Sequence, residues 1–184
     1  MDEENRLLNE SIGYLRPIIF TALNTGMRRG EILGLKWSDI DLNTNMIIVN
    51  QTNSKSKKER KIPINSVLRN LLIELKLKSD ENLYVFTDDV GNPIKSIRSA
   101  FGSAIKKAGV SDLKFHDLRH TAATRMVEAG ANIVAISKIL GHSDIKTTMR
   151  YAHPEDSLID ALESLGKFGK NTTNIATNEN ELNL

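Results

Sequence analysis

The sequence predicts a mostly α-helical domain with a small antiparallel β-sheet, an α+β arrangement, and three observations support this prediction. Apolar residues recur at helical spacing through most of the chain, and glycines follow many of these segments. Two short apolar runs flank a basic segment, which is the pattern of a β-hairpin. With 184 residues, the chain is long enough for one buried core and short for two.

The first part of the chain is predicted to contain two helices after a polar start. Residues 1–10 have few apolar anchors, and we expect a loose polar arm there. Apolar spacing predicts a helix over 12–23, in which Pro17 occupies or bends the first turn. Gly26 is expected to end this helix in a left-handed conformation, and a short helix over 28–35 follows it.

A hairpin or a three-stranded sheet is expected next. The stretch 39–45 is rich in turn formers, and the runs 46–49 and 61–64 predict two strands, with Pro63 suited to an edge strand. Basic side chains crowd the segment between them, namely Lys55, Lys57, Lys58, Arg60 and Lys61. Such a cluster suits contact with phosphates, and it equally suits the solvated tip of a hairpin.

Helices account for most of the remaining chain. Apolar spacing, capping residues and terminal glycines predict them over 67–75, 97–108, 116–129, 132–140, 143–151 and 154–165. Asn132 and Ser143 are the predicted N-caps of two of these helices. Residues 167–184 are rich in Asn and Thr, which predicts a disordered polar tail.

Composition excludes several classes of protein. The absence of cysteine rules out a disulfide scaffold, a thiolate nucleophile and a cysteine-ligated zinc site. The start Met-Asp-Glu-Glu-Asn is not a signal peptide, and no apolar run approaches the ~20 residues that cross a bilayer. We therefore expect a cytoplasmic protein without a membrane anchor. The net charge of +2 by itself says little about partners.

Two segments carry side chains that suit anion binding and proton transfer. Arg28 directly follows the Gly26 stop, where free backbone N–H groups of a new helix attract anions, and Glu31 lies one turn further on to hold the guanidinium. His116 and Arg119 are three residues apart and share a helix face. This spacing places a proton-transfer group beside a bidentate phosphate clamp.

Three further residues have ordinary explanations when each is taken alone. His120 lies four residues after His116, the spacing of two zinc ligands on a helix, but Asp117 stands where a metalloprotease has Glu. No third ligand is evident, so we do not expect a metal site. His142 follows a helix-ending glycine and suits a cap, while Tyr151 suits core packing.

Taken in order, these segments resemble the tyrosine recombinase (phage integrase) family. The family's Thr-Gly-Leu-Arg-x-x-Glu motif is matched by residues 25–31, with methionine in place of leucine, and its usual continuation by residues 31–41. Its Lys-Glu-Arg stretch and proline-containing strand are matched by residues 58–64, which places the active lysine at Lys55.

The family's remaining motifs follow in the second half of the chain. His116 and Arg119 match its His-x-x-Arg motif, residues 140–142 match Leu-Gly-His, and the nucleophile falls on Tyr151. The resemblance covers about residues 11–165. Each motif alone is weak, whereas all of them in order are strong.

The resemblance implies the catalytic-domain fold of DNA breaking-rejoining enzymes and an enzyme of site-specific DNA recombination. Tyr151 would attack the scissile phosphate and form a 3′-phosphotyrosine, while Lys55 would protonate the departing 5′ oxygen. Arg28 and Arg119 would hold the non-bridging oxygens. The assisting roles fall to His116 as proton acceptor, His142 as phosphate hydrogen-bond donor, Glu31 as orienting residue, and Lys57, Lys58 and Arg60 as DNA contacts.

The resemblance also implies the partners and the domain organisation. Double-stranded DNA is the expected partner, without a metal or nucleotide cofactor. The catalytic domain would span 11–166, and the amino-terminal core-binding domain of the family would be missing, so we expect a fragment of a longer bacterial integrase. The full-length protein would form a tetramer on two DNA sites, and the isolated fragment would be a monomer.

Other functions stay open at this point. The chain could be a DNA-binding module without chemistry, a type IB topoisomerase, a telomere resolvase, or a metal hydrolase built on His116 and His120. The DNA target, the mobile element that it serves and the identity of the acid among the hairpin lysines are not determined by the sequence.

Overall fold

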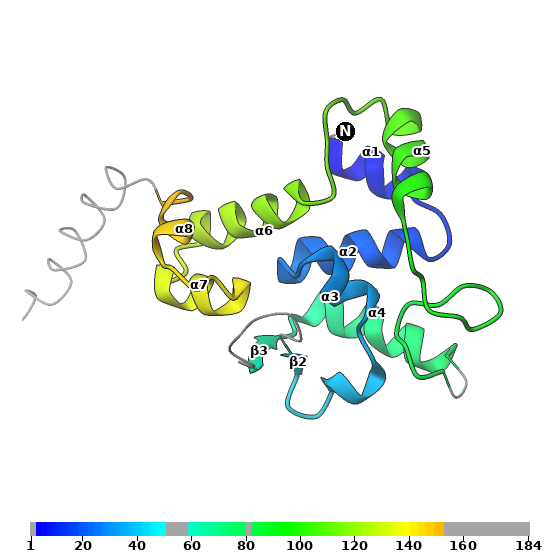
Figure 1. Ribbon diagram of the computed structural model, residues 1–184, viewed down its shortest axis with the longest axis horizontal. Coiled ribbons are helices and arrows are strands. Elements are labelled where there is room, and N and C mark those ends of the chain that lie inside the picture. Colours follow the sequence, from blue (N-terminus) through cyan, green and yellow to red (C-terminus); the bar gives the residue numbers. More distant parts are fainter. Residues whose placement is uncertain (1–2, 51–58, 80–81, 153–184) are drawn as a thin grey trace, which may run out of the picture.

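The computed structural model describes residues 3–50, 59–79 and 82–152. It confirms the mostly helical chain with a small antiparallel sheet. In Figure 1, α2 lies at the centre, α1 and α5 pack together on one side of it, and α6, α7 and α8 extend to the other. Helices α3 and α4 and the sheet occupy the remaining side.

The expectation that residues 1–10 form a loose arm is wrong. Helix α1 (Glu3–Glu10) packs against α5 (Arg98–Ala108), and Leu7 is only 1% exposed. A helix this short is stabilised mainly by the face that it buries. The polar composition of the segment concealed this face, because only Leu7 is buried in it and Leu8 packs, half-buried, against the same core.

Helix α2 (Leu15–Thr25) ends where the sequence predicts. Pro17 lies in its first turn, and Gly26 has a φ of +64° and closes it. A Cβ at Gly26 would lie 2.6 Å from Leu140 Cδ2, so a glycine is required there for space as well as for backbone conformation. The short helix α3 (Arg29–Leu33) follows immediately.

The predicted strands form an antiparallel sheet in the order β1-β2-β3. After a 3-10 turn over Trp37–Asp39 come β1 (Ile40–Asp41), β2 (Met46–Asn50) and β3 (Glu59–Pro63). Ile47 of β2 pairs with Ile62 of β3, and both are almost fully buried. β3 is an edge strand, as Pro63 predicts, and the basic tip over 51–58 lies outside the described residues.

The later helices lie in the predicted segments, and all but the last of those described have nearly the predicted bounds. They are α4 (Ser66–Leu77), α5, α6 (Asp117–Glu128), α7 (Ile133–Leu140) and α8 (Lys146–Met149). The Asn132 side chain accepts hydrogen bonds from the backbone N–H groups of Val134 and Ala135, which confirms it as the N-cap of α7. Gly141 then ends α7 with a φ of +68°.

Helix α8 is shorter than expected, and Ser143 does not cap it. The helix begins at Lys146, so Ser143 lies before its first turn. The side chain of Asp144 accepts the backbone N–H of Lys146 instead. The helix predicted over 154–165 and the tail over 167–184 lie outside the described residues.

Two apolar clusters hold these elements together. The larger one extends from α1 and α2 through the sheet to α4, α5 and the start of α6. The smaller one consists of Ala123, Ile136 and Leu140, which join α6 to α7, and the ring of Tyr151 packs against it. Within the described ranges, no helix is both long and apolar enough to cross a membrane.

Candidate active site

A cavity of about 430 Å³ lies where the start of α3 meets α6, α7 and α8. The side chains that line it are Arg28, His116, Arg119, His120, His142, Thr147, Arg150 and Tyr151. Five of the six predicted catalytic residues are among them. The sixth, Lys55, lies outside the described residues, as do Lys57 and Lys58.

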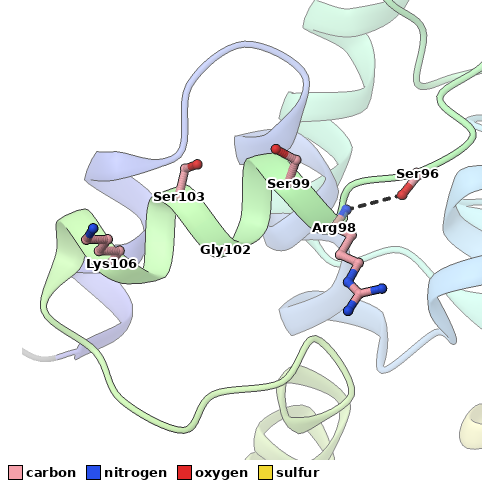
Figure 2. Close-up of a pocket in the computed structure, with 6 residues that line it drawn as sticks. All are labelled: Ser96, Arg98, Ser99, Gly102, Ser103 and Lys106. Atoms are coloured by element: carbon pink, nitrogen blue, oxygen red, sulfur yellow. Dashed lines mark hydrogen bonds between the residues drawn. The ribbon is translucent and has the colours of Figure 1, made fainter.

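A second hollow, on α5, offers different chemistry. Figure 2 shows its lining residues on α5 and on the segment just before it, namely Ser96, Arg98, Ser99, Gly102, Ser103 and Lys106. Ser96 Oγ accepts the backbone N–H of Arg98, and the residues that line this hollow include no histidine, tyrosine, cysteine or carboxylate. The first cavity is therefore the better candidate for proton transfer and nucleophilic attack.

Three arginine side chains lie at the carboxyl end of α7, beside this cavity. Arg60 Nε, Arg119 and Arg28 donate to three successive carbonyl oxygens, those of residues 139, 140 and 141, at 2.8, 2.7 and 3.3 Å. The last carbonyls of a helix have no partner within it and carry a partial negative charge. The end of α7 therefore draws together cations from β3, α6 and the start of α3.

Arg119 is the most firmly held of the three. Its second terminal nitrogen donates to the carbonyl of Gly26 at 2.7 Å, so it bridges the ends of α2 and α7, and it is only 3% exposed. Burial and, next, the nearby charge of Arg28 lower the pKa of Arg119 to about 10. The side chain therefore remains a cation at neutral pH.

Glu31 holds Arg28, as the sequence predicts. Its carboxylate accepts the Arg28 guanidinium at 3.1 Å and the Arg28 backbone N–H at 2.7 Å. The backbone N–H of Met27 also has a partner, the hydroxyl of Thr25. Two of the backbone N–H groups near Arg28 are therefore paired within the protein, and the guanidinium is the charged group that this corner offers to an anion.

Arg60, expected among the DNA-contacting side chains, lies inside the protein. It is only 9% exposed, and both of its terminal nitrogens donate to Glu31, at 2.9 and 2.7 Å. The strand alternation carried a signal for this placement, because Arg60 shares the inward face of β3 with Ile62. Lysine-rich neighbours in the sequence obscured it.

The charge of Glu31 is stabilised by these contacts. Burial acts to raise the pKa of its carboxyl group, but hydrogen bonds from Arg60 and the Arg28 backbone, together with the two positive charges, outweigh burial and lower the pKa below its ordinary value. Glu31 is therefore a carboxylate that fixes two guanidinium groups at once.

Two of the predicted histidines are neutral at physiological pH. Burial and, next, the charge of Arg119 lower the pKa of His142 to about 4, and its Nδ1 hydrogen-bonds to the hydroxyl of Thr148 at 2.7 Å. Burial and the neighbouring His120 lower the pKa of His116. A neutral imidazole can donate a hydrogen bond at one nitrogen and accept a proton at the other.

Tyr151 lines the cavity beside His120, which the sequence suggested only as a possible metal ligand. His120 Nδ1 hydrogen-bonds to the Tyr151 hydroxyl. The sequence signal for His120 was its spacing of four residues from His116 on one helix. Thr147 and Arg150, which also line the cavity, had no motif to mark them.

The model of the phage integrase family matches residues 1–157. The chain belongs to the phage integrase family. It is 33% identical over 83% of its length to a tyrosine recombinase XerC-like protein of Caldanaerobacter subterraneus subsp. tengcongensis, and 28% identical over 97% of its length to the integrase of Salmonella phage P22. It spans about half the length of these relatives, 49% and 50%.

Solved structures confirm the expected fold. The Tn1549 transposon integrase, in complex with a circular intermediate DNA, has a TM-score of 0.74 at 26% identity, with 88% of this chain and 63% of that one covered. XerA recombinase has a TM-score of 0.69 at 31% identity, with 90% of this chain and 62% of that one covered. The catalytic domain of bacteriophage HP1 integrase has a TM-score of 0.63 at 32% identity, with 82% of this chain and 83% of that one covered.

Proposed function

We propose that this chain is the catalytic part of a tyrosine-type site-specific DNA recombinase, which cleaves and rejoins double-stranded DNA through a 3′-phosphotyrosine on Tyr151. One observation carries the proposal. Arg28, Arg119 and Tyr151 lie far apart in the sequence, and all three line one cavity. Two guanidinium groups beside a phenol are the components that attack on a phosphodiester requires.

The arginines neutralise the charge that develops on phosphorus. The planar guanidinium fork matches two phosphate oxygens better than an ammonium group does. Arg119 is held by two carbonyls and Arg28 by Glu31, so both donors are in place before the substrate binds. Preset donors of this kind contribute on the order of 10²–10³ in rate.

The remaining groups handle protons and position the phosphate. His142, neutral at physiological pH, donates a hydrogen bond to a phosphate oxygen, and His116 assists in accepting the phenolic proton. Lys55 protonates the departing 5′ oxygen. The covalent phosphotyrosine conserves the energy of the phosphodiester, so rejoining requires no nucleotide cofactor, and the guanidinium groups take the charge that a metal ion would otherwise neutralise.

DNA is the partner that this chemistry requires, and relatives support it. The Tn1549 transposon integrase was solved with a circular intermediate DNA. In the present chain, Lys57 and Lys58 would contact phosphates near the cleavage point. We further propose that a full-length protein containing this catalytic part acts on DNA in the bacterial cytoplasm as a tetramer on two sites, and that the isolated 184-residue chain is a monomer.

Covalent trapping tests this function directly. The chain is incubated with a pool of duplexes of randomised sequence that carry a 5′-labelled strand nicked a few nucleotides beyond the central position, so that the released fragment diffuses away. We expect a labelled adduct stable in detergent, mapped by mass spectrometry to Tyr151, and its formation in excess chelator. Tyr151→Phe is the matched control, because it removes one oxygen and should leave DNA binding nearly intact.

Two results would contradict this function. An adduct with Tyr151→Phe would mean that another residue is the nucleophile. DNA binding without any adduct would favour a binding module that lacks chemistry. The proposed acid has its own test, since the defect of Lys55→Ala should be rescued by a substrate with a 5′-bridging sulfur, whose leaving group needs no proton.

A further inference from the structure

We propose that His120 is a catalytic residue of this site, whose imidazole takes the phenolic proton from Tyr151 as the phosphotyrosine forms. The inference rests on the proposed function, because it concerns the same nucleophile. It adds a residue that lies outside the set of motif positions, and it gives that residue the contact with the reacting oxygen.

The contact between the two side chains is direct. His120 Nδ1 hydrogen-bonds to the Tyr151 hydroxyl, and the two ring centroids are 5.7 Å apart at an interplanar angle of 44°. The ring of His116 stands edge-on to His120, with centroids 4.8 Å apart at 89°. The geometry therefore orders the groups as phenol, His120 and His116, with His120 next to the nucleophile.

Rigid elements fix both partners of this hydrogen bond. The Tyr151 ring packs against the apolar cluster that joins α6 to α7. His120 follows Arg119 in the first half of α6, and Arg119 is anchored by the carbonyls of Gly26 and Leu140. A reacting pair supported by packing on one side and by hydrogen bonds on the other is preorganised.

Cations and imidazoles surround the phenol in the cavity. The groups that line the same cavity are the cations Arg28, Arg119 and Arg150 and the imidazoles of His116 and His142. None of these carries negative charge, so the lining suits the negative charge that develops on the phosphate during attack. The remaining requirement is an acceptor within hydrogen-bond reach of the oxygen, which His120 meets.

The step balances as follows. The bond between Tyr151 Oη and phosphorus forms, and the bond between phosphorus and the 5′ oxygen breaks. The phenolic proton moves to His120 Nδ1, and the 5′ oxygen takes a proton from the acid assigned to Lys55. In the reverse reaction His120 returns its proton to the departing phenol, so that strand rejoining regenerates Tyr151.

The first experiment compares rates of adduct formation on the pool of nicked duplexes. We expect His120→Ala to slow adduct formation by about 10²-fold or more, with DNA affinity and melting temperature unchanged. His120→Asn should be slow as well, because its amide can hydrogen-bond to the phenol but cannot accept a proton. Glu128→Gln, on an exposed position of the same helix, is the matched control and should react at the parent rate.

The second experiment separates proton acceptance from positioning. A fluorinated tyrosine incorporated at position 151 is a more acidic phenol and depends less on a base. The rate loss caused by His120→Ala should therefore shrink at least tenfold in the fluorinated protein. A merely structural role for His120 would leave the loss unchanged.

The outcomes distinguish this inference from the function on which it rests. A parent rate in His120→Ala or His120→Asn, or an equal loss with either phenol, would overturn the role of His120 while the Tyr151 adduct still forms. A parent chain that binds the pool and forms no adduct would overturn the proposed function and this inference together.

Discussion

Glu31 accepts both terminal nitrogens of Arg60, at 2.9 and 2.7 Å, across 29 positions of sequence. The two side chains are only 15% and 8% exposed. Because Arg60 Nε also donates to the carbonyl of Ile139, this ion pair joins α3, β3 and the end of α7. Glu31 in turn holds Arg28, so the pair lies directly behind one of the two proposed phosphate clamps.

Arg60→Met should destabilise the fold strongly. The substitution leaves Glu31 buried with only Arg28 as a partner, and removal of one member of a buried pair costs about 3–5 kcal/mol. Arg60→Lys should recover part of this loss, since lysine restores the charge but not the two-pronged contact. Chemical denaturation measures both, with the exposed pair Glu3–Arg6 as control, where Glu3→Gln should cost less than about 1 kcal/mol. Equal losses in the two pairs would contradict this account.

The contribution of Glu31 should depend on pH. The folded carboxyl group has a pKa below 4.5, so the folded state binds a proton less readily than the unfolded chain does. The stabilisation is therefore fully present above pH 4.5 and is lost as pH falls through the lower folded pKa. Glu31→Gln should be markedly less stable than the parent at pH 7, and the gap should narrow below pH 4.5. A gap that stays constant down to pH 3 would be inconsistent with this linkage.

His142 should titrate well below the usual range of an imidazole. Its pKa of about 4 means that the folded state resists protonation, so its contribution to stability is full above pH 6.5 and declines between pH 6.5 and 4. Ring chemical shifts followed by NMR, assigned with His142→Gln, measure the midpoint. A midpoint near 6.5 would show that burial and the neighbouring arginines do not act on this ring.

Gly26→Ala should destabilise the fold more than the same substitution at another helix-ending glycine. The new Cβ would lie 2.6 Å from the buried Leu140 and would sit at a φ of +64°. Strain and overpacking together predict a loss of about 2–4 kcal/mol. Gly109→Ala is the matched control, because its φ is +62° and nothing lies within 4 Å, so only about 1–2 kcal/mol is expected. Similar melting temperatures for the two variants would show that the close approach of Leu140 to Gly26 adds no destabilisation.

Leu7→Ala tests whether α1 belongs to the folded domain. Leu7 is 1% exposed in the contact with α5, so truncation should cost about 2–5 kcal/mol. Ile12→Ala, at a side chain that is 77% exposed, should change stability by less than about 0.5 kcal/mol. A loose arm would instead make both substitutions harmless in thermal unfolding.

Local patterns in the sequence determined most of the secondary structure and the set of motif residues. Gly26, Gly109 and Gly141 mark helix ends because only a residue without a side chain adopts the left-handed conformation at no cost. Apolar spacing located α2, α4, α5, α6 and α7, because residues three or four positions apart lie on the same face of a helix. Residues within one turn of each other, such as Arg28 and Glu31, could also be paired from their spacing alone.

Only the tertiary structure decided which distant groups meet. Arg60 points inward because its guanidinium donates to the carbonyl of Ile139 at the end of α7 and to the carboxylate of Glu31. His120 reaches the Tyr151 hydroxyl because the apolar cluster between α6 and α7 places α8 beside it. Such contacts depend on the packing of whole helices, and neither propensity nor spacing along a single segment encodes them.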